Sequence, residues 1–233
     1  MTTYDFNDGN GPVPAHQHPN GGGWVADSAT VDVSAFVGPD AQVYGNAKVS
    51  GNALVSDKAR VAGNALVSDK ARVAGNARVS NDARVLGKAL VSGNAQVAGK
   101  AGVYGNAQVF DNTQVFDYAV VSGNAQVYGN ARVCGNAEVY STAEVSGNAE
   151  VYGNAEVSGN AEVTKTPVRI SRSDGYDFII VPCSDGKECI IAGCRYFTYE
   201  EADEHWNKEH PMYAETSIIL EALKNLYELQ KSL

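Results

Sequence analysis

The chain has 233 residues, of which 44% are hydrophobic, and its formal net charge is −9. This acidic balance argues against general affinity for nucleic acid or for acidic membranes. The sequence contains no run of 18 apolar residues, so we expect no membrane span. Four cysteines are too few for a disulfide scaffold in a chain of this length, so we expect a reduced, cytoplasmic protein.

Residues 1–23 form a polar amino-terminal arm or cap, without the basic and apolar segments of a secretion signal. His16 and His18 make an H-x-H pair, but this pair supplies only two of the four ligands that a zinc site usually needs. We therefore expect no metal here and predict an arm that packs loosely on the first repeat.

From residue 24 to residue 164 the sequence follows a period of six. Valine recurs every six residues from Val25 to Val163, which gives 24 valines, and alanine stands two positions before each later valine except at Thr113. Residues two apart lie on the same side of an extended strand, so both point inward. Most units also contain Gly-Asn, whose tolerance of positive φ allows a corner every six residues. Three hexads then close one 18-residue coil, and a period of six excludes an α-helix.

This pattern resembles the hexapeptide-repeat superfamily over residues 24–164. The resemblance implies an all-β solenoid, a left-handed parallel β-helix of eight coils that is roughly 38 Å long at about 4.8 Å per coil. One coil buries too little apolar surface to offset the entropy lost on ordering it, so stability must come from stacking. Homotrimers are the usual assembly of this superfamily, and we carry a homotrimer over as an expectation.

The residue before each repeat valine points outward and changes its charge along the chain. It is repeatedly basic early in the solenoid, where Arg60, Arg72, Arg78 and Arg84 are candidate binding residues. It becomes glutamate late in the solenoid, at Glu138, Glu144, Glu150, Glu156 and Glu162. Solubility explains such charges without any partner, whereas the sharper hypothesis is docking of a partner or end-to-side self-association.

Outward aromatic residues cluster in the middle and late coils. The candidates for an interface are Tyr104, Phe110, Phe116, Tyr128, Tyr140 and Tyr152. A coil of 18 residues places Phe110 directly beneath Tyr128 on one face, and the other four fall in pairs on the two remaining faces. Aromatic side chains that point away from the core are typical of an interface with another subunit or partner.

Many proteins of the hexapeptide-repeat superfamily are acyltransferases, and some are zinc-dependent carbonic anhydrases. In these enzymes a histidine acts as the general base or as a metal ligand. The four histidines here are His16, His18, His205 and His210, all outside the repeat, and no loop interrupts it. We therefore predict no catalytic residue, no metal site and no cofactor. Cys183, Cys189 and Cys194 with the last two histidines lack a tight C-x2-C spacing, so buried structural thiols are the better interpretation of these cysteines than zinc ligands.

Residues 165–233 read as a small α+β domain. Ser173-Asp174-Gly175 separates two apolar stretches and predicts a hairpin, and Asp185-Gly186 predicts a second turn before a strand that starts at Glu188. Thr198 and Glu201 form a capping box for a helix through about Lys208. A final helix over roughly 213–231 carries an apolar stripe that should dock on this domain or on a neighbouring subunit: Ile219, Leu223, Leu226 and Leu233.

The GGGWVADSATV entry, the GNA-x-V arrays and the trailing IIAGCRYFTYEEADEHW segment are similar to hexapeptide-repeat proteins encoded by bacteriophages and prophages. This resemblance supplies no active-site residues. Our leading hypothesis is a non-catalytic, trimeric scaffold or binding protein that antagonises or sequesters a host factor, with a host or phage protein as partner. The alternatives are an acyltransferase or its degenerate relative, a sponge for a small phosphate-bearing nucleotide signal, and a structural component of the virion.

Overall fold

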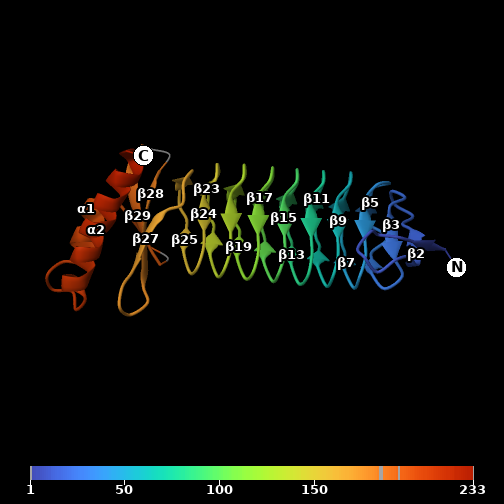
Figure 1. Cartoon of the computed structure of the whole chain (residues 1–233), viewed down its shortest axis with the longest axis horizontal. Helices are drawn as coiled ribbons and strands as arrows, with labels where there is room; N and C mark the ends of the chain where they lie inside the picture. Colours follow the sequence, from blue (N-terminus) through green and yellow to red (C-terminus); the bar gives the residue numbers. More distant parts are fainter. Residues whose placement is uncertain (1, 184–185, 194, 233) are drawn as a thin grey trace.

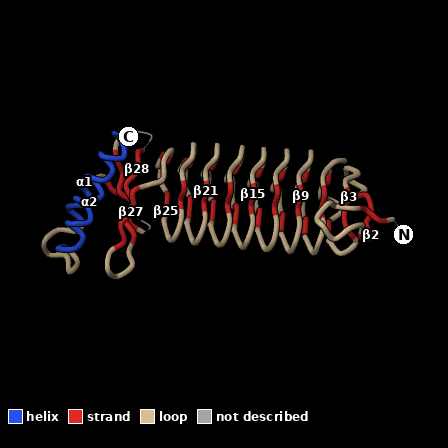
Figure 2. Tube along the Cα trace, viewed as in Figure 1, coloured by secondary structure: helices blue, strands red, loops and turns tan. Residues whose placement is uncertain are grey.

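The computed structural model describes residues 2–183, 186–193 and 195–232. They form a rod, with an amino-terminal hairpin at one end and a small domain of strands and two helices at the other (Figures 1 and 2). The rod is a parallel β-solenoid of eight coils over residues 24–163, all of them described. The predicted fold class, a β-solenoid followed by a small α+β domain, is confirmed.

The solenoid has three faces, because each hexad contributes one short strand and each coil contributes three. Face 1 is made of β3 (Trp24–Ala26), β6 (Gln42–Val43), β9 (Arg60–Val61), β12 (Arg78–Val79), β15 (Gln96–Val97), β18 (Gln114–Val115), β21 (Arg132–Val133) and β24 (Glu150–Val151). Face 2 is made of β4 (Thr30–Val31), β7 (Lys48–Val49), β10 (Leu66–Val67), β13 (Arg84–Val85), β16 (Gly102–Val103), β19 (Val120–Val121), β22 (Glu138–Val139) and β25 (Glu156–Val157). Face 3 is made of β5 (Phe36–Val37), β8 (Leu54–Val55), β11 (Arg72–Val73), β14 (Leu90–Val91), β17 (Gln108–Val109), β20 (Gln126–Val127), β23 (Glu144–Val145) and β26 (Glu162–Val163).

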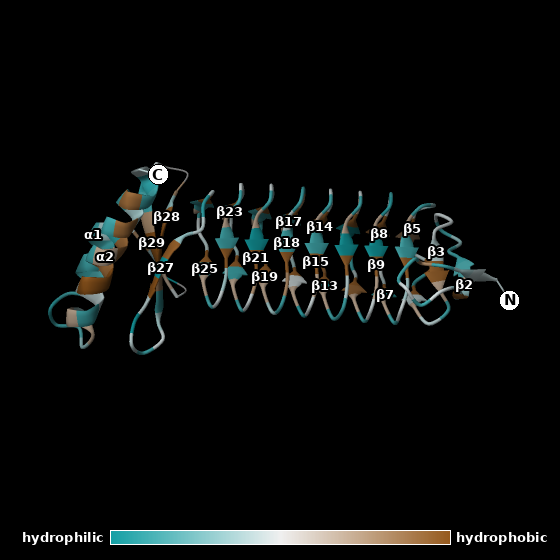
Figure 3. Ribbon diagram, viewed as in Figure 1, coloured by the Kyte–Doolittle hydropathy of each residue, from teal (hydrophilic) through white to brown (hydrophobic). Residues whose placement is uncertain are grey.

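The interior of the solenoid is a stack of valine and alanine. Of the 24 repeat valines, all in the described part of the chain, 23 are buried and Val31 is half-buried. Figure 3 shows hydrophilic and hydrophobic residues side by side on these strands, as expected when neighbours point to opposite sides. Successive coils pair in register, so that each valine lies beside the valine 18 residues later, as Val67 does beside Val85.

The prediction that all the repeat valines are buried is wrong at Val31, and the reason is an end effect. At the amino-terminal edge, β3 pairs with β2, and Val37 of β5 exchanges backbone hydrogen bonds with Asn20 and Gly23 at 3.0 and 2.9 Å. Within the described residues β4 pairs with β7 alone. Val31 therefore has cover on one side only.

The corners turn at residues with positive φ. Most are glycine, but aspartate replaces glycine at four of them and gains a hydrogen bond that glycine cannot make. Each of these carboxylates accepts from the glycine N–H one coil later, at 2.9–3.2 Å: Asp57 from Gly75, Asp69 from Gly87, Asp111 from Gly129 and Asp117 from Gly135. The unusual backbone at the corner is thus tied to the next coil.

The amino-terminal arm is not loosely packed, contrary to the prediction. Strands β1 (Thr3–Tyr4) and β2 (Val13–Gln17) form an antiparallel hairpin, and β2 extends the sheet of face 1 by pairing with β3. Phe6 is buried between this hairpin and the first coil, where Tyr4 stacks on Trp24 with 4.4 Å between the ring centroids. The arm therefore closes the end of the solenoid over face 1.

The described residues after position 164 form a four-stranded antiparallel sheet and two helices. The strands are β27 (Val168–Ser171), β28 (Asp177–Pro182), β29 (Glu188–Ala192) and β30 (Arg195–Phe197), and the helices are α1 (Tyr199–His205) and α2 (Tyr213–Ser232). The predicted hairpin and the capping box of Thr198 and Glu201 are confirmed, although α1 ends at His205 rather than near Lys208. Residue 185 of the predicted second turn lies outside the described residues.

This sheet lies between the solenoid and the helices. Ile179 and Ile191 point into the open end of the solenoid, whereas Phe178 and Ile180 pack against the helices. The continuous apolar runs of β28 and β29 follow from burial on both faces. Among the described residues, neither helix is long and apolar enough to cross a membrane.

Two side-chain predictions for this domain need correction. Cys183 and Cys189 are buried, but they form a disulfide with 6.3 Å between their Cα atoms, so the prediction of free thiols is wrong for this pair. The antiparallel register brings them together, because Val181, two residues before Cys183, lies opposite Cys189. Cys194 lies outside the described residues.

The buried stripe of α2 also differs from the prediction. Ile219 and Leu223 are buried as predicted, together with Tyr227, but Leu226 is 47% exposed. Ile219, Leu223 and Tyr227 follow one another at intervals of four residues, so they lie on one face of the helix, and this face packs against the sheet. Leu233 is not among the described residues.

Candidate binding surface

The four candidate arginines are divided among the three faces. Arg60 and Arg78 are adjacent on face 1, where β9 pairs with β12. Arg72 lies on face 3 and precedes Arg78 by one hexad in the chain, so the two flank a single corner. Arg84 lies on face 2. The structure thus brings three of the predicted arginines to one corner and separates Arg84 from them.

A row of asparagines follows that corner along the rod, a feature that we call the asparagine ridge: Asn76, Asn94, Asn112, Asn130 and Asn148. Each amide nitrogen donates to the amide oxygen of the next asparagine 18 residues later, at 3.0, 2.9, 3.2 and 3.1 Å in turn. All five side chains are exposed. Because an amide has two N–H donors and an oxygen with two lone pairs, an asparagine within the ladder keeps one donor and one acceptor site for a partner.

The early end of the ridge is basic. Lys58 stands 18 residues before Asn76 and so occupies the same corner one coil earlier. Lys58, Arg72 and Arg78 are exposed and Arg60 is half-buried. None of the four is in an ion pair with any described residue. The nearest corner carboxylate, Asp57, accepts from a backbone N–H of the next coil. We call Lys58, Arg60, Arg72 and Arg78 the basic end of the ridge.

A pair of stacked rings borders the middle of the ridge. Phe110 and Tyr128 lie on face 3 with 5.1 Å between their centroids and 4° between their planes, and each stands two residues before a ridge asparagine. The Tyr128 hydroxyl donates to a Glu144 carboxylate oxygen at 3.2 Å. The predicted contact of these two rings is confirmed. Both rings are half-buried, because they lie along the sheet rather than pointing into solvent.

The other four candidate aromatics lie away from the ridge and contact residues of this chain. On face 1, the Arg132 guanidinium lies 5.4 Å from the Phe116 ring, and the Arg169 guanidinium lies 5.1 Å from the Tyr152 ring. On face 2, the Tyr104 ring covers Gly102, and the Tyr140 hydroxyl donates to Glu156 at 3.1 Å. Only Tyr152 of the six candidates, all in the described chain, is exposed, at 45%.

The histidines have structural contacts at the two ends of the molecule. His16 Nδ1 lies 2.8 Å from an Asp27 carboxylate oxygen. His18 is buried and accepts from the Asn20 N–H at 3.3 Å. Partial burial and the Arg195 guanidinium, which donates to Nε2 at 2.6 Å, lower the pKa of His205. His210 Nδ1 accepts from the Met212 N–H at 3.1 Å. Each histidine is thus tied to its own local structure.

Neither metal-ligand clusters nor a reactive thiol mark another site in the described chain. Across residues 2–183, 186–193 and 195–232, no group of three or more His, Cys, Asp or Glu side chains could hold a metal ion. Cys134 is a half-buried free thiol on the outer side of face 1. Burial, followed by the negative charge of Asp117, raises its pKa, so its reactive thiolate is disfavoured.

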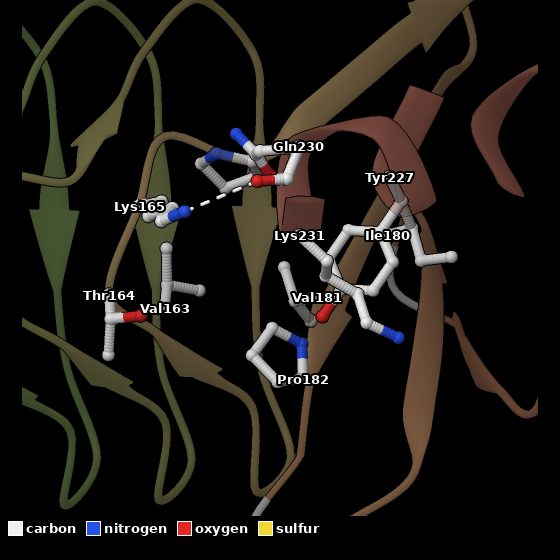
Figure 4. Close-up of a pocket in the computed structure, with 10 residues that line it drawn as sticks. Val163, Thr164, Lys165, Ile180, Val181, Pro182, Tyr227, Gln230 and Lys231 are labelled. Carbon is white, nitrogen blue, oxygen red and sulfur yellow. Dashed lines mark hydrogen bonds between the residues drawn. The ribbon is translucent and has the colours of Figure 1, made fainter. Parts of the chain in front are cut away.

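A cavity of about 200 Å³ lies where the solenoid meets α2. Figure 4 shows Val163, Ile180 and Tyr227 lining it, with Lys165 and Lys231 among the polar residues around it. Lys165 Nζ donates to the Gln230 carbonyl at 3.2 Å, and Lys231 Nζ contacts Glu188 and Glu228 at 2.7 and 2.9 Å. The contact with Gln230 joins the carboxy-terminal helix to the segment that follows the solenoid, and the contact with Glu188 joins this helix to the end sheet. The sequence predicted the domain but not this cavity.

The asparagine ridge was not predicted from the sequence either. Its signal was present, because asparagine recurs at intervals of 18 residues from Asn76 to Asn148. In the structure the same spacing places each amide within hydrogen-bonding distance of the next.

Comparison with known families supports the repeat and says nothing of a site. Residues 41–57 and 125–141 match a family model described as YdcK beta solenoid repeat. Both segments lie within the solenoid, in early and late coils respectively. No curated protein matches the chain. Two segments of the solenoid are therefore similar to the repeats of this family.

Proposed function

We propose that this protein is a non-catalytic scaffold that binds an acidic segment of a partner protein along the asparagine ridge. The observation that carries the proposal is the basic end, where Lys58, Arg60, Arg72 and Arg78 lie around one corner without an ion pair to any described residue. Unpaired cations on a rigid surface attract and orient an anionic partner at little cost in conformational entropy.

The ridge supplies groups that recognise an extended peptide beyond its charge. The free donor and acceptor of each ladder asparagine match the N–H and C=O groups of a peptide backbone. The Phe110–Tyr128 stack offers apolar surface beside Asn112 and Asn130. A segment with acidic residues at one end and an apolar residue about two coils further along, roughly 10 Å away at 4.8 Å per coil, would contact all three features.

The setting of this function is part of the proposal. The resemblance of the sequence to bacteriophage and prophage proteins supports a phage origin, and a host protein is then one source of the acidic segment. A homotrimer remains a prediction from the same resemblance, and the mass of the native assembly tests it.

A defined peptide tests the proposed surface. A fluorescent dodecapeptide with six glutamates followed by alternating leucine and serine would be titrated with the full chain, and binding measured by anisotropy at 50 and 300 mM NaCl. We expect saturable binding that weakens about tenfold or more at the higher salt, because surface charges are screened over about 10 Å at 0.1 M salt. The triple variant Arg60→Glu/Arg72→Glu/Arg78→Glu should lose this binding.

The matched control is Lys70→Glu/Lys88→Glu/Lys100→Glu, which makes the same charge change on nearby coils but at the other two corners. This control should bind the peptide within about threefold of the unmodified chain. Equal loss of binding in both triple variants would show that net charge rather than the ridge attracts the peptide. Undetectable binding by the unmodified chain at 50 mM NaCl would contradict the proposal.

A further inference from the structure

Face 2 carries a graded row of outward residues. Strand register places them in a continuous line along the rod: Thr30, Lys48, Leu66, Arg84, Gly102, Val120, Glu138 and Glu156. The row is basic in its first half and acidic in its second half. Leu66 and Val120 stand between the charges and are half-buried, although they lie outside the core.

Three of these charges are in no ion pair with a described residue. They are Lys48, Arg84 and Glu138, and all three are exposed. In the middle of the row the Tyr104 ring lies across Gly102, where a Cβ would come within 2.2 Å of the ring. The centre of face 2 is therefore an aromatic ring on a flat strand, and Lys48 and Glu138 lie at equal distances on either side of the midpoint between Arg84 and Gly102.

We propose that face 2 binds a second copy of this chain in antiparallel orientation, which makes the assembly a dimer and replaces the homotrimer expected from the family resemblance. When the two rows overlap completely, Lys48 of each copy lies opposite Glu138 of the other, and Leu66 lies opposite Val120. Arg84 then lies opposite Gly102 and the Tyr104 ring that covers it, the arrangement of a cation–π contact. A twofold axis repeats every one of these contacts, so each favourable pair counts twice.

Neither of the other faces has this complementarity. On face 1, complete antiparallel overlap places Arg60 opposite Gln114 and Arg78 opposite Gln96. On face 3 it places Leu54 opposite Glu144, a poor match. A parallel pair through face 2 would set Lys48 beside Lys48 and Glu138 beside Glu138, and such like-charge contacts oppose association.

The size of face 2 reaches the lower limit for a specific pair. Eight coils at about 4.8 Å and a flat width of about 15 Å give roughly 570 Å² per copy. The total of roughly 1,100 Å² exceeds the approximately 1,000 Å² expected of a specific interface. This surface lies on the side of the triangle opposite the asparagine ridge, so both can be occupied at once.

Charge exchange tests the pair. The mass of the full chain would be measured by native mass spectrometry and by sedimentation at about 10 µM. We expect twice the chain mass of 24.6 kDa. Lys48→Glu and Glu138→Lys alone should each raise the dissociation constant about tenfold or more, because each sets like charges opposite one another twice. The double variant Lys48→Glu/Glu138→Lys should recover the affinity of the unmodified chain to within about threefold.

The matched control is Arg78→Glu, which reverses a charge at the same repeat position on face 1. It should remain a dimer while weakening peptide binding at the ridge, whereas Lys48→Glu should do the opposite, so the two proposals fail independently. A monomer or a trimer of the unmodified chain would overturn the antiparallel pair. So would a dimer that the single reversals leave intact, or a folded double variant, verified by circular dichroism, that stays dissociated.

Discussion

The inside and the outside of the solenoid follow opposite rules. Inside, the same two residue types recur from the first coil to the last, with Thr113 as the exception in the alanine row. Outside, the residue one step from each buried valine varies from arginine to leucine to glutamate. The uniform interior specifies how coils stack, and it distinguishes no coil from another. Whatever distinguishes one coil of this protein from another in function must therefore come from its outer side chains.

The largest effect is expected where this contrast is tested within one strand. Val109 is fully buried and Gln108 beside it is exposed. Val109→Asp should lower the free energy of unfolding by several kcal/mol, because a carboxylate without a partner is placed in an apolar stack. Gln108→Asp introduces the same residue on the outer side and should change the free energy of unfolding by less than about 1 kcal/mol. Urea unfolding measures the free energy of both variants. Similar losses of stability would contradict the assignment of Val109 to the inside and Gln108 to the outside of the solenoid.

A smaller effect is expected at a corner. Gly105 has φ of +70°, and a Cβ there would lie 3.0 Å from the Gly123 carbonyl oxygen of the next coil. Gly105→Ala should therefore cost about 1–2 kcal/mol through backbone strain and crowding. Asn106→Ala, at the following corner position, removes one exposed side-chain hydrogen bond and should cost less than 1 kcal/mol. Thermal unfolding of the two variants gives the comparison, and the reverse order would contradict it.

The exception in the interior gives a finer test. The Thr113 hydroxyl donates to the Phe110 carbonyl at 2.6 Å. In most other hexads the alanine N–H donates to the carbonyl three residues earlier, as the Ala107 N–H does to the Tyr104 carbonyl. Thr113→Val keeps the volume but removes this donor, so we expect a loss of about 1 kcal/mol. Thr113→Ala restores the common repeat residue and should lose less than Thr113→Val. Chemical denaturation measures both, and a more stable valine variant would show that the hydroxyl contributes nothing.

The smallest effect is expected on the outer surface of the last coil. Tyr152 is 45% exposed, and its ring faces the Arg169 guanidinium. Tyr152→Ala should change the free energy of unfolding by no more than about 0.5–1 kcal/mol, since an exposed cation–π contact contributes little. Differential scanning calorimetry would check this value. A loss as large as that of Val109→Asp would place Tyr152 in the structural core.

The fold was predictable because a period of six leaves little choice of backbone. Valine and alanine two positions apart fix which side faces inward, and the spacing of 18 also predicted that Phe110 stacks on Tyr128. Val31 differed because a repeat pattern cannot show which end strand lacks a neighbour. Pairing of Cys183 with Cys189 depends on the hairpin register, which the spacing between the two cysteines does not reveal.

The candidate surface was predictable only in part. The sequence identified the outward arginines. Whether two of them lie close together depends on whether they stand on either side of the same corner of the solenoid. Arg72 and Arg78 flank one corner, whereas Arg84, the next in the series, lies on the remaining face. In the last helix, Leu226 and Tyr227 are equally compatible with an apolar stripe, and contact with the sheet selects Tyr227.

The central claim is that outer cations at one corner, rather than histidines, carry the function. Its most direct test is capture of partner proteins from the source cells by two variants with verified folding. One variant is Arg60→Glu/Arg72→Glu/Arg78→Glu, and the other replaces the unburied histidines His16, His205 and His210 by alanine. We predict that the histidine variant retains the partners of the unmodified protein and that the arginine variant loses them. Capture by the arginine variant together with loss in the histidine variant would contradict the account.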